Sequence, residues 1–148
     1  MKVLKKDFKL DVAIGYAVNM VANKARQELE NTFAINNYDI TAPQWMVLSI
    51  IHENEGINQN ELSKLSRKDK TNVTRIIEKL ERKGLVKRVR DEFDKRVFRL
   101  YQTQKGKDTR SHLSELTSSL ISKSTVGITD DEYGVCMKVL NKMYENML

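Results

Sequence analysis

The chain has 148 residues, enough for one compact domain or for one lobe joined to a small dimerisation element. Apolar residues make up 40% and charged residues 31% of the sequence, which contains only one proline and six glycines. This composition favours a folded, mostly helical protein over a disordered chain or an all-β fold with many turns. No run approaches the ~18 consecutive apolar residues of a membrane-spanning helix, so we expect no membrane partner.

Cysteine usage and the first residues predict where the protein works. Cys136 is the single cysteine, which excludes an intramolecular disulfide and suits a reducing cytoplasm. No apolar run follows the basic residues between Met1 and Asp7, so we expect no signal peptide and a cytoplasmic location. Cys136 could be a redox trigger, but its place on an apolar helix seam favours core packing.

The net charge of +6 is concentrated in one stretch of the chain. From Lys64 to Arg99 there are 14 Lys or Arg against six Asp or Glu, a net of +8, while the remaining residues carry −2. A local basic patch is typical of proteins that bind polyanions, because Lys and Arg displace counterions from phosphates. A solvated charged face is the alternative interpretation of this stretch.

Two helices are predicted before the basic stretch. Apolar residues at helical spacing between Leu10 and Leu29 predict a long helix over 8–34. A capping box opens at Thr41, and the helix that follows should end before Gly56. Its apolar side chains should be buried; these are Trp45, Leu48 and Ile51.

Two short helices joined by a tight turn are predicted next. A capping signature at Asn58 opens a two-turn helix whose inner face should contain Leu62 and Leu65. A second helix over 70–83 carries four apolar residues on one side, namely Val73, Ile76, Ile77 and Leu80. Two short helices in this arrangement form a helix-turn-helix.

The sequence period changes after Gly84. Two runs rich in β-branched and aromatic residues, 85–90 and 96–101, flank a polar loop over 91–95. This pattern predicts a β-hairpin with a basic edge, which is a wing.

Two closing helices follow the hairpin. Thr103 caps a helix that should run to about Lys123, and a capping box at Thr129 opens the last helix. The last helix carries apolar residues at alternating steps of three and four: Tyr133, Cys136, Leu140, Met143 and Met147. Such a narrow seam suits a partner helix better than a broad core.

The outer face of helix 70–83 carries side chains that can read DNA. At about 100° per residue, polar residues lie opposite the apolar side, and Thr, Asn, Arg and Lys are the types that reach base edges and phosphates in a major groove. An ordinary amphipathic helix with a solvated face is the alternative. We expect base contacts from Thr71, Asn72, Thr74 and Arg75, and phosphate contacts from Lys68 and Lys70.

The predicted hairpin adds a second basic element beside this helix. An arginine on such a loop can enter a narrowed minor groove, where the negative potential is enhanced. An ordinary surface hairpin, whose charges only discourage edge pairing, is the alternative. Asp94 is spaced to orient the guanidinium of Arg96. The wing residues expected at DNA are Arg88, Arg90, Asp94, Lys95 and Arg96.

The order of these elements and four motifs resemble the MarR family over nearly the whole chain. The motifs are Gln59–Ser63, Val73–Val86, Asp91–Arg96 and Thr103–Gly106. The resemblance implies a mostly α fold, a winged helix-turn-helix within a single domain over 1–148. In this domain the DNA-binding lobe covers 41–101, and the dimerisation helices cover 8–34 and 104–148. It also implies a homodimer on pseudo-palindromic operators of double-stranded DNA, usually a repressor released by a small ligand or an oxidant.

The sequence departs from the family pattern at two positions. Phe93 stands where the wing, usually Asp-x-Arg-Asp-x-Arg, has its first arginine, and Gln102 stands where a leucine commonly precedes Thr103. A wing contact by Arg96 remains our expectation because Asp94, Lys95 and Arg96 are intact. Phe93 could instead pack on the sugar-phosphate surface or on the partner subunit.

Catalysis and metal binding find no support in the sequence. His52 and His112 fall on different predicted helices, and no Walker loop or Ser-His-Asp order occurs, so we expect no enzyme. Glu53 and Glu55 near His52 match no strong metal signature. We expect neither a metal nor a resident cofactor.

A small aromatic or phenolic effector could bind between the dimerisation helices and the DNA lobe, as the resemblance implies. The side chains considered for this pocket are Trp45, Tyr16, Tyr38 and the methionines. Nothing in the sequence identifies the ligand, and an apolar stripe of this kind is more often part of the core.

Other functions stay open beside the predicted ligand-responsive repressor. A nonspecific architectural DNA binder would share the basic wing. A protein-interaction adaptor that has lost DNA binding is a further alternative, although the concentrated positive charge argues against it.

Overall fold

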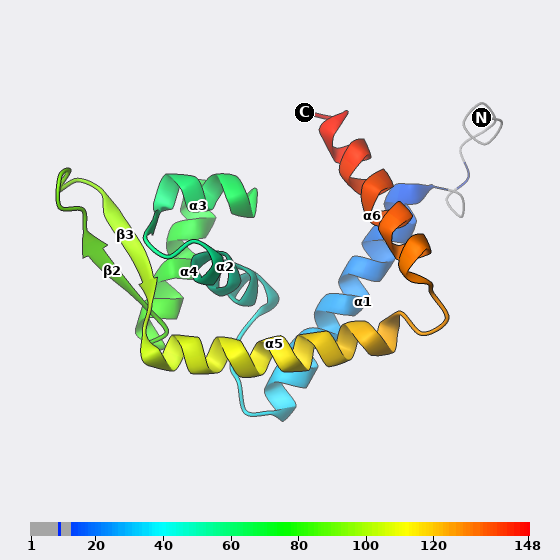
Figure 1. The fold of residues 1–148 in the computed structure, drawn as a ribbon, viewed down its shortest axis with the longest axis horizontal. Coiled ribbons are helices and arrows are strands. Elements are labelled where there is room, and N and C mark those ends of the chain that lie inside the picture. Colours follow the sequence, from blue (N-terminus) through cyan, green and yellow to red (C-terminus); the bar gives the residue numbers. More distant parts are fainter. Residues whose placement is uncertain (1–8, 10–12) are drawn as a thin grey trace. The chain divides into compact units, whose positions relative to one another are not determined.

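The structure is a computed structural model that describes residue 9 and residues 13–148. The described residues form a mostly α fold with a small antiparallel sheet (Figure 1), as predicted. The helices are α1 (Ile14–Ile35), α2 (Ala42–Glu53), α3 (Gln59–Ser66), α4 (Lys70–Arg82), α5 (Gln104–Ser124) and α6 (Asp130–Glu145). The strands are β1 (Ile57–Asn58), β2 (Val86–Arg90) and β3 (Phe98–Gln102). The chain divides into two compact units, one that ends at Thr117 and one that covers Ser118–Leu148.

The first helix begins later than the sequence pattern indicated. We predicted a start at residue 8, whereas α1 starts at Ile14. Ala13 precedes it in an extended conformation and has no side-chain oxygen with which to cap the helix. Leu10, which the pattern placed on the apolar stripe, lies outside the described residues. Phe33 is the buried residue of α1.

Three helices begin where their capping boxes predicted. Thr41, Asn58 and Thr129 each accept a backbone N–H from the third helical residue, whose side chain accepts the backbone N–H of the capping residue. These reciprocal bonds satisfy backbone donors that have no partner inside the helix. They fix the first turns of α2, α3 and α6.

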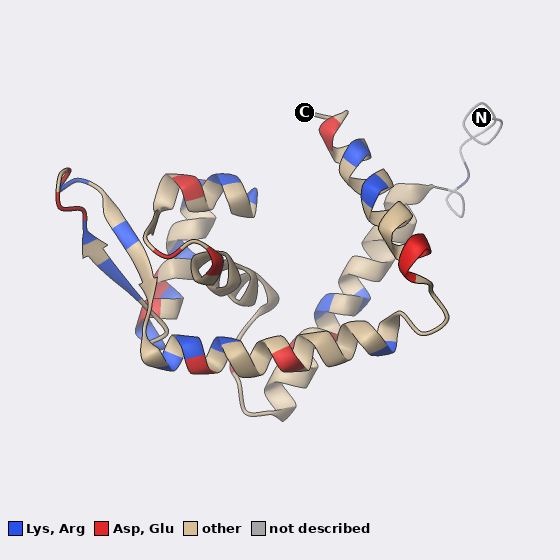
Figure 2. Cartoon of the chain, viewed as in Figure 1, with Lys and Arg blue, Asp and Glu red and all other residues tan. Residues whose placement is uncertain are grey.

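The sheet has the strand order β1-β3-β2 and contains the predicted wing. β3 begins at Phe98, two residues later than the predicted run. The reason is local: the Asp91 N–H donates to the Val97 carbonyl at 2.9 Å, and the Val97 N–H donates to the Asp94 carbonyl at 2.9 Å. Residues 96 and 97 therefore belong to the wing loop. Basic residues lie along β2, and acidic residues lie in the wing loop after it (Figure 2).

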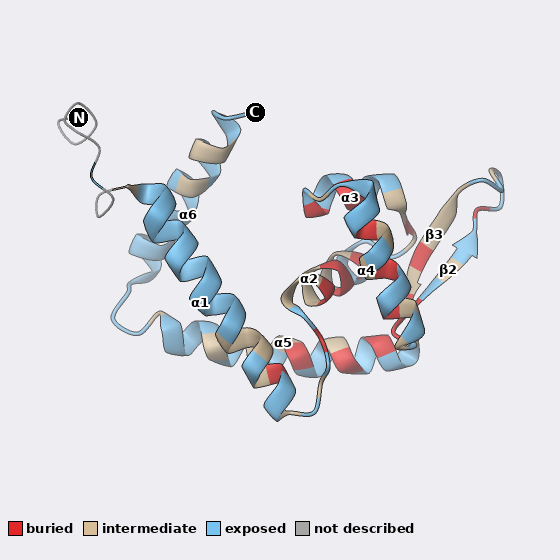
Figure 3. Cartoon of the chain, turned by 180° about the vertical axis from the view of Figure 1, so that it is seen from behind, coloured by how far each residue is buried: buried red, intermediate tan, exposed pale blue. Residues whose placement is uncertain are grey.

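The core lies where α2, α3, α4, β3 and the first half of α5 meet (Figure 3). Trp45 is only half-buried and packs its ring edge-on against Phe33, with 6.0 Å between ring centres. The largest fully buried side chains include Phe33, Leu48, Ile51, Leu62, Ile77, Leu80, Leu100 and Leu113. The burial of Leu48 and Ile51 confirms the inner face predicted for α2.

The inner face of α3 differs from the prediction. Leu62 is fully buried, but Leu65 is 55% exposed. Ser63 and Ser66 are buried in its place. Because serine is small, α3 can lie close to both α2 and α4, which it contacts. The apolar spacing of the sequence gave no sign that small polar residues would form this face.

The unusual Gln102 has partners for its polar groups. The side chain is buried, its Nε2 donates to the Leu48 carbonyl at 3.5 Å, and its Oε1 lies 3.1 Å from Nδ1 of His52. Its backbone N–H donates to Glu55 at 3.3 Å. A polar group can replace an apolar one in a core when its hydrogen bonds are satisfied.

The start of α5 packs closely on the two residues that precede β2, Gly84 and Leu85. The Thr103 hydroxyl donates to the Gly84 carbonyl at 2.6 Å and accepts the Gly106 N–H at 2.9 Å. A Cβ atom on Gly106 would lie 2.0 Å from the Leu85 carbonyl oxygen, so only glycine fits. The backbone of α5 therefore lies directly on the chain that enters the wing.

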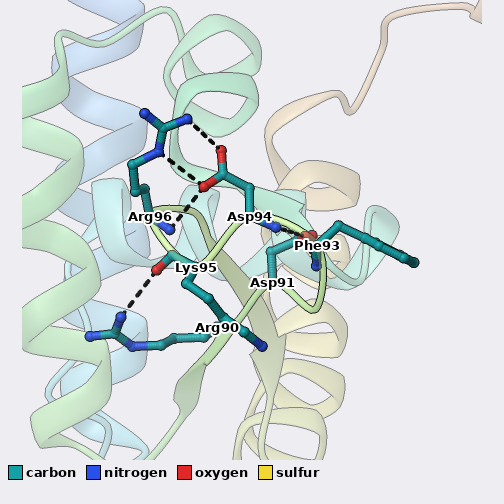
Figure 4. A network of polar contacts seen from close by, with 6 residues as sticks. All are labelled: Arg90, Asp91, Phe93, Asp94, Lys95 and Arg96. Atoms are coloured by element: carbon teal, nitrogen blue, oxygen red, sulfur yellow. Dashed lines mark hydrogen bonds and ion pairs between the residues drawn. The ribbon is translucent and has the colours of Figure 1, made fainter.

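Asp91 organises the wing loop (Figure 4). Its carboxylate accepts the backbone N–H groups of Phe93 at 2.8 Å and Asp94 at 2.9 Å. Outside the residues drawn there, it also accepts the Nε–H of Arg99. Arg99 also donates to the Gly56 carbonyl at 2.9 Å, which ties the loop to the turn before β1. The hydrogen bond from the Asp94 N–H, followed by the Arg99 guanidinium, lowers the pKa of Asp91 to about 2.

We predict that Gly106→Ala destabilises the fold by about 2 kcal/mol or more, because the added methyl group forces α5 away from the Leu85 carbonyl. Urea unfolding measures this change. Gly134→Ala is the matched control, since a Cβ there meets no atom within 4 Å and alanine favours a helix. Equal stability of the two variants would contradict the proposed close approach.

We predict that the pKa of the Asp91 carboxyl is about 2 and not 3.8, and an NMR titration of this side chain tests the prediction. Because the pKa is lower in the folded protein than in the unfolded chain, the charged carboxylate stabilises the fold above about pH 4. This contribution is lost as the pH falls towards 2. The difference in the free energy of unfolding between wild type and Asp91→Asn should therefore shrink over that interval, and a constant difference would contradict the role of the charge.

Candidate nucleic-acid interface

A tight turn positions the N-terminus of α4. Arg67 takes a left-handed conformation with φ of 54° at the end of α3. Asp69 then caps α4, and its carboxylate accepts the Asn72 backbone N–H at 2.9 Å and the Asn72 side-chain amide at 2.6 Å. The hydrogen bond from the Asn72 N–H lowers the pKa of Asp69. The carboxylate therefore holds both the first turn of the helix and the side chain of Asn72.

The rotation of α4 about its axis separates an apolar from a polar face. Val73, Ile77 and Leu80 are fully buried, while Ile76 is half-buried. The opposite face exposes four side chains that the sequence assigned to DNA, namely Lys70, Thr71, Asn72 and Arg75. An exposed face of this composition has the donors and acceptors that base edges and phosphates require.

Thr74 has a different environment from these exposed neighbours. It is half-buried, its hydroxyl donates to the Lys70 carbonyl at 2.8 Å, and it accepts a hydrogen bond from the Gln59 side chain of α3. These bonds connect the two helices of the helix-turn-helix. The sequence pattern assigned Thr74 to base reading and did not identify Gln59, because their contact joins residues 15 positions apart.

The start of α2 lies beside the polar face of α4. Thr41 and Pro43 line a shallow hollow of about 360 Å³ together with four side chains that lie on or just before α4: Lys68, Asn72, Arg75 and Lys79. Lys68 is half-buried in this position. Lys79 was not among the residues predicted at DNA, although its spacing of four residues from Arg75 places it on the same face of the helix.

Arg88 and Arg90 lie along the hairpin. Arg88 forms an ion pair with Glu81 at 2.7 Å, so its guanidinium connects the wing to α4. Arg90 donates to the Lys95 carbonyl at 3.1 Å and lies over the Phe98 ring, 5.2 Å from its centre. These contacts hold two of the predicted wing cations in fixed positions.

Arg96 is presented at the wing loop by Asp94 (Figure 4). The Arg96 Nε and Nη2 atoms lie 3.1 and 3.2 Å from the two oxygens of the Asp94 carboxylate. The Arg96 backbone N–H also donates to this carboxylate at 3.0 Å. The Arg96 side chain is 91% exposed, and its hydrogen bond lowers the pKa of Asp94. The pair that the spacing predicted is present, with the guanidinium held in solvent.

Two of the aromatic residues considered for an effector pocket, Tyr38 and Trp45, each contact a side chain of α5. The Tyr38 hydroxyl lies 2.7 Å from Nδ1 of His112, with Tyr38 in the loop before α2 and His112 on α5. Arg110 lies over the Trp45 ring at 6.0 Å, and its Nε is buried without a hydrogen-bond partner. Tyr16 lies on the exposed part of α1 and joins neither pair.

The described residues contain neither a metal-binding cluster nor a membrane-spanning helix. Within residues 13–148 and residue 9, no three His, Cys, Asp or Glu side chains gather closely enough to hold a metal ion. None of the helices in this part of the chain is sufficiently long and apolar to cross a bilayer.

Known proteins are similar to this chain in sequence and in fold. The sequence model of the MarR family matches residues 40–98. The HTH-type transcriptional regulator YybA of Bacillus subtilis is 28% identical over 130 residues, which are 88% of this chain and 85% of that protein. A MarR protein of Peptoclostridium difficile is 28% identical with a TM-score of 0.83, and the match covers 96% of this chain and 94% of that one.

Two structures of lower identity share the fold. CouR, a transcriptional repressor bound to a 23-mer DNA duplex, has a TM-score of 0.84 at 23% identity, covering 94% of this chain and 99% of that one. PcaV, a transcriptional regulator of Streptomyces coelicolor in complex with its natural ligand, has a TM-score of 0.85 at 20% identity, covering 97% and 99%.

The region matched by the family model contains the helix-turn-helix and most of the wing. The relative from Bacillus subtilis extends the match over most of the chain, and the structure from Peptoclostridium difficile does the same for the fold. The sequence and the fold are those of a winged helix-turn-helix, DNA-binding transcriptional regulator and not of an enzyme, similar to the MarR family by the model match over residues 40–98 and by relatives that cover most of the chain.

Proposed function

We propose that this regulator is a ligand-responsive repressor that binds pseudo-palindromic operators as a homodimer. The observation that carries the DNA contact is the exposed polar face of α4 beside the wing, where Arg96 stands 91% exposed on its carboxylate support. CouR, a repressor by its description, and PcaV, bound to its natural ligand, support a repressor that responds to a small molecule.

The polar face of α4 supplies the contacts to the major groove. Thr71, Asn72 and Arg75 are exposed and read base edges. Thr74 positions α4 through its bonds to α3. Phosphate contacts come from three lysines around the same surface, namely Lys68, Lys70 and Lys79. In a dimer the two α4 helices lie one helical turn of DNA apart, about 34 Å.

The wing supplies the contacts to the minor groove. The Arg96 guanidinium enters the groove, where a narrow width enhances the negative potential. Asp94 restricts its orientation before binding, which lowers the entropy lost when the complex forms. Arg90 and Lys95 lie at the base and tip of the loop and contact phosphates, while Arg88 stays paired with Glu81.

A second copy of the chain covers the apolar side chains of α6. No residue of α6 is buried in the single described chain, although the helix carries the seam predicted from the sequence. Tyr133 and Cys136 are exposed, and Leu140 and Met143 are half-buried. Exposed apolar surface of this extent is typical of an interface. The expected burial of Cys136 therefore requires the partner subunit.

The effector is an aromatic or phenolic molecule, of which an aromatic acid suits the polar groups near α5 best. The buried Nε of Arg110 offers a hydrogen bond to a carboxylate, and the Trp45 ring beside it offers an aromatic surface. Tyr38 and His112 add a hydroxyl and an imidazole to the same half of the chain.

Selection of bound fragments from a genomic pool tests sequence-specific binding. We expect a recurring pseudo-palindrome, on which Arg75→Ala costs about 1–3 kcal/mol and relaxes the preference at one base. Lys68→Ala should weaken binding to specific and random duplexes alike and lower the salt dependence by about one phosphate contact. Equal affinity of the wild-type protein for every duplex at fixed salt would instead indicate a nonspecific architectural binder.

Sedimentation tests the homodimer. The double variant Leu140→Glu/Met143→Glu should weaken self-association at least tenfold, because it places charges in an apolar interface. Lys138→Glu is the control, because Lys138 lies on the opposite side of α6 and its exchange should leave the dimer intact. A wild-type monomer at micromolar concentration would contradict the proposed dimer.

A further inference from the structure

The wing loop carries an aromatic side chain that none of the described residues covers. Phe93 is 94% exposed, more than any other large apolar side chain among the described residues. Water around an exposed aromatic ring is unfavourable, so a partner that covers the ring gains binding free energy. The ring stands where the family's wing usually has a cation.

The backbone at Phe93 is held firmly. The Phe93 N–H donates to the Asp91 carboxylate at 2.8 Å, and Asp91 is itself buried and bonded to Arg99. Arg99 is anchored on the Gly56 carbonyl at 2.9 Å. The ring is therefore carried by a backbone that is fixed to the body of the DNA-binding lobe.

The surroundings of the ring indicate what covers it. The loop contains three acidic residues, but the whole hairpin over 86–102 carries six Lys or Arg, a net charge of +3, so the wing is attracted to a polyanion. Figure 4 shows the Phe93 side chain extending away from the Asp94–Arg96 pair. The loop thus presents a cation and an aromatic ring in different directions. The apolar parts of a DNA duplex that such a ring can reach are the sugars and the stacked bases.

We propose that Phe93 is a wedge that enters the minor groove at a base step separate from the Arg96 contact and partly unstacks that step in each half of the operator. The inference rests on the proposed function, because it assumes that the wing contacts DNA. Apolar side chains in a minor groove act in this way and kink the duplex. An arginine at this position would contact phosphates by charge. The Phe93 ring instead makes an apolar contact whose strength depends on how easily the base step unstacks.

The wedge has a consequence for sequence preference. Pyrimidine–purine steps such as TA and CA unstack more readily than other steps. The operator should therefore favour these steps at the position under the wing, although Phe93 makes no hydrogen bond there. This preference is separate from the bases read by Arg75 on α4.

Fluorescence of 2-aminopurine tests the wedge, because the base becomes brighter when it loses its stacking partner. A duplex selected by the wild-type protein is prepared with 2-aminopurine at successive steps under the wing. We expect binding of the wild-type dimer to raise the signal at one step in each half. Phe93→Ala should abolish this rise and weaken binding about tenfold. The variant keeps the backbone N–H that Asp91 accepts, so the loop is retained.

Two further variants separate the ring from charge. Phe93→Leu should keep most of the fluorescence rise, because leucine is also an apolar wedge. Phe93→Arg should restore affinity with a steeper salt dependence and no rise. Arg96→Ala should weaken binding while the rise at saturating protein remains.

The outcomes distinguish this inference from the proposed function. Tight sequence-specific binding without a fluorescence rise at any step would overturn the wedge and leave the repressor intact. Failure of the wild-type protein to bind any duplex would overturn both. Weaker self-association of Phe93→Ala in the absence of DNA would assign the ring to the partner subunit and would also overturn the wedge.

Discussion

The burial of one side of α4 is the constraint on which the rest of the DNA-binding surface depends. Val73, Ile77 and Leu80 are fully buried, and a roll of the helix would bring apolar groups into water. The same burial determines which residues face outwards. Exposure of Arg75 and Thr71 thus follows from the packing of residues that never meet the ligand. The buried side of α4 therefore determines the direction of the exposed side chains that are proposed to contact DNA.

The wing has a different origin of order. It has few buried apolar residues, so the hydrogen bonds of a carboxylate, and not apolar packing, determine its structure. Asp91 accepts two backbone N–H groups and an arginine, and this network determines the path of the loop. A second carboxylate, on Asp94, then orients Arg96. Asp91 and Asp94 thus have a structural role in a basic hairpin, and this role costs the hairpin part of its positive charge.

Much of the fold could be predicted from the sequence. Capping boxes located the starts of α2, α3 and α6, because they depend on residues three positions apart. The prediction failed where distant packing decides the outcome. Leu65 has the spacing of a core residue, yet Ser63 and Ser66 take the buried side because α3 lies close to its neighbours. The late start of β3 depends on loop hydrogen bonds that no period in the sequence reveals.

The candidate site was predicted to a similar degree. Helical spacing is sufficient to place Asn72 and Arg75 on the exposed face, and a separation of two residues is sufficient to suggest the Asp94–Arg96 pair. The contribution of α2 to the same surface could not be predicted, because Thr41 and Lys68 are brought together by the fold alone. The roles of these side chains at DNA remain predictions.

The bond between Gln59 and Thr74 bears on how regulators of this design diversify. It joins α3 to the N-terminal half of α4. A rotation of α4 would therefore break this polar contact and also expose the apolar side of the helix. New operator preferences are then most accessible through exchange of individual outward-facing residues. The backbone of the helix-turn-helix can then stay unchanged while single exposed side chains are substituted.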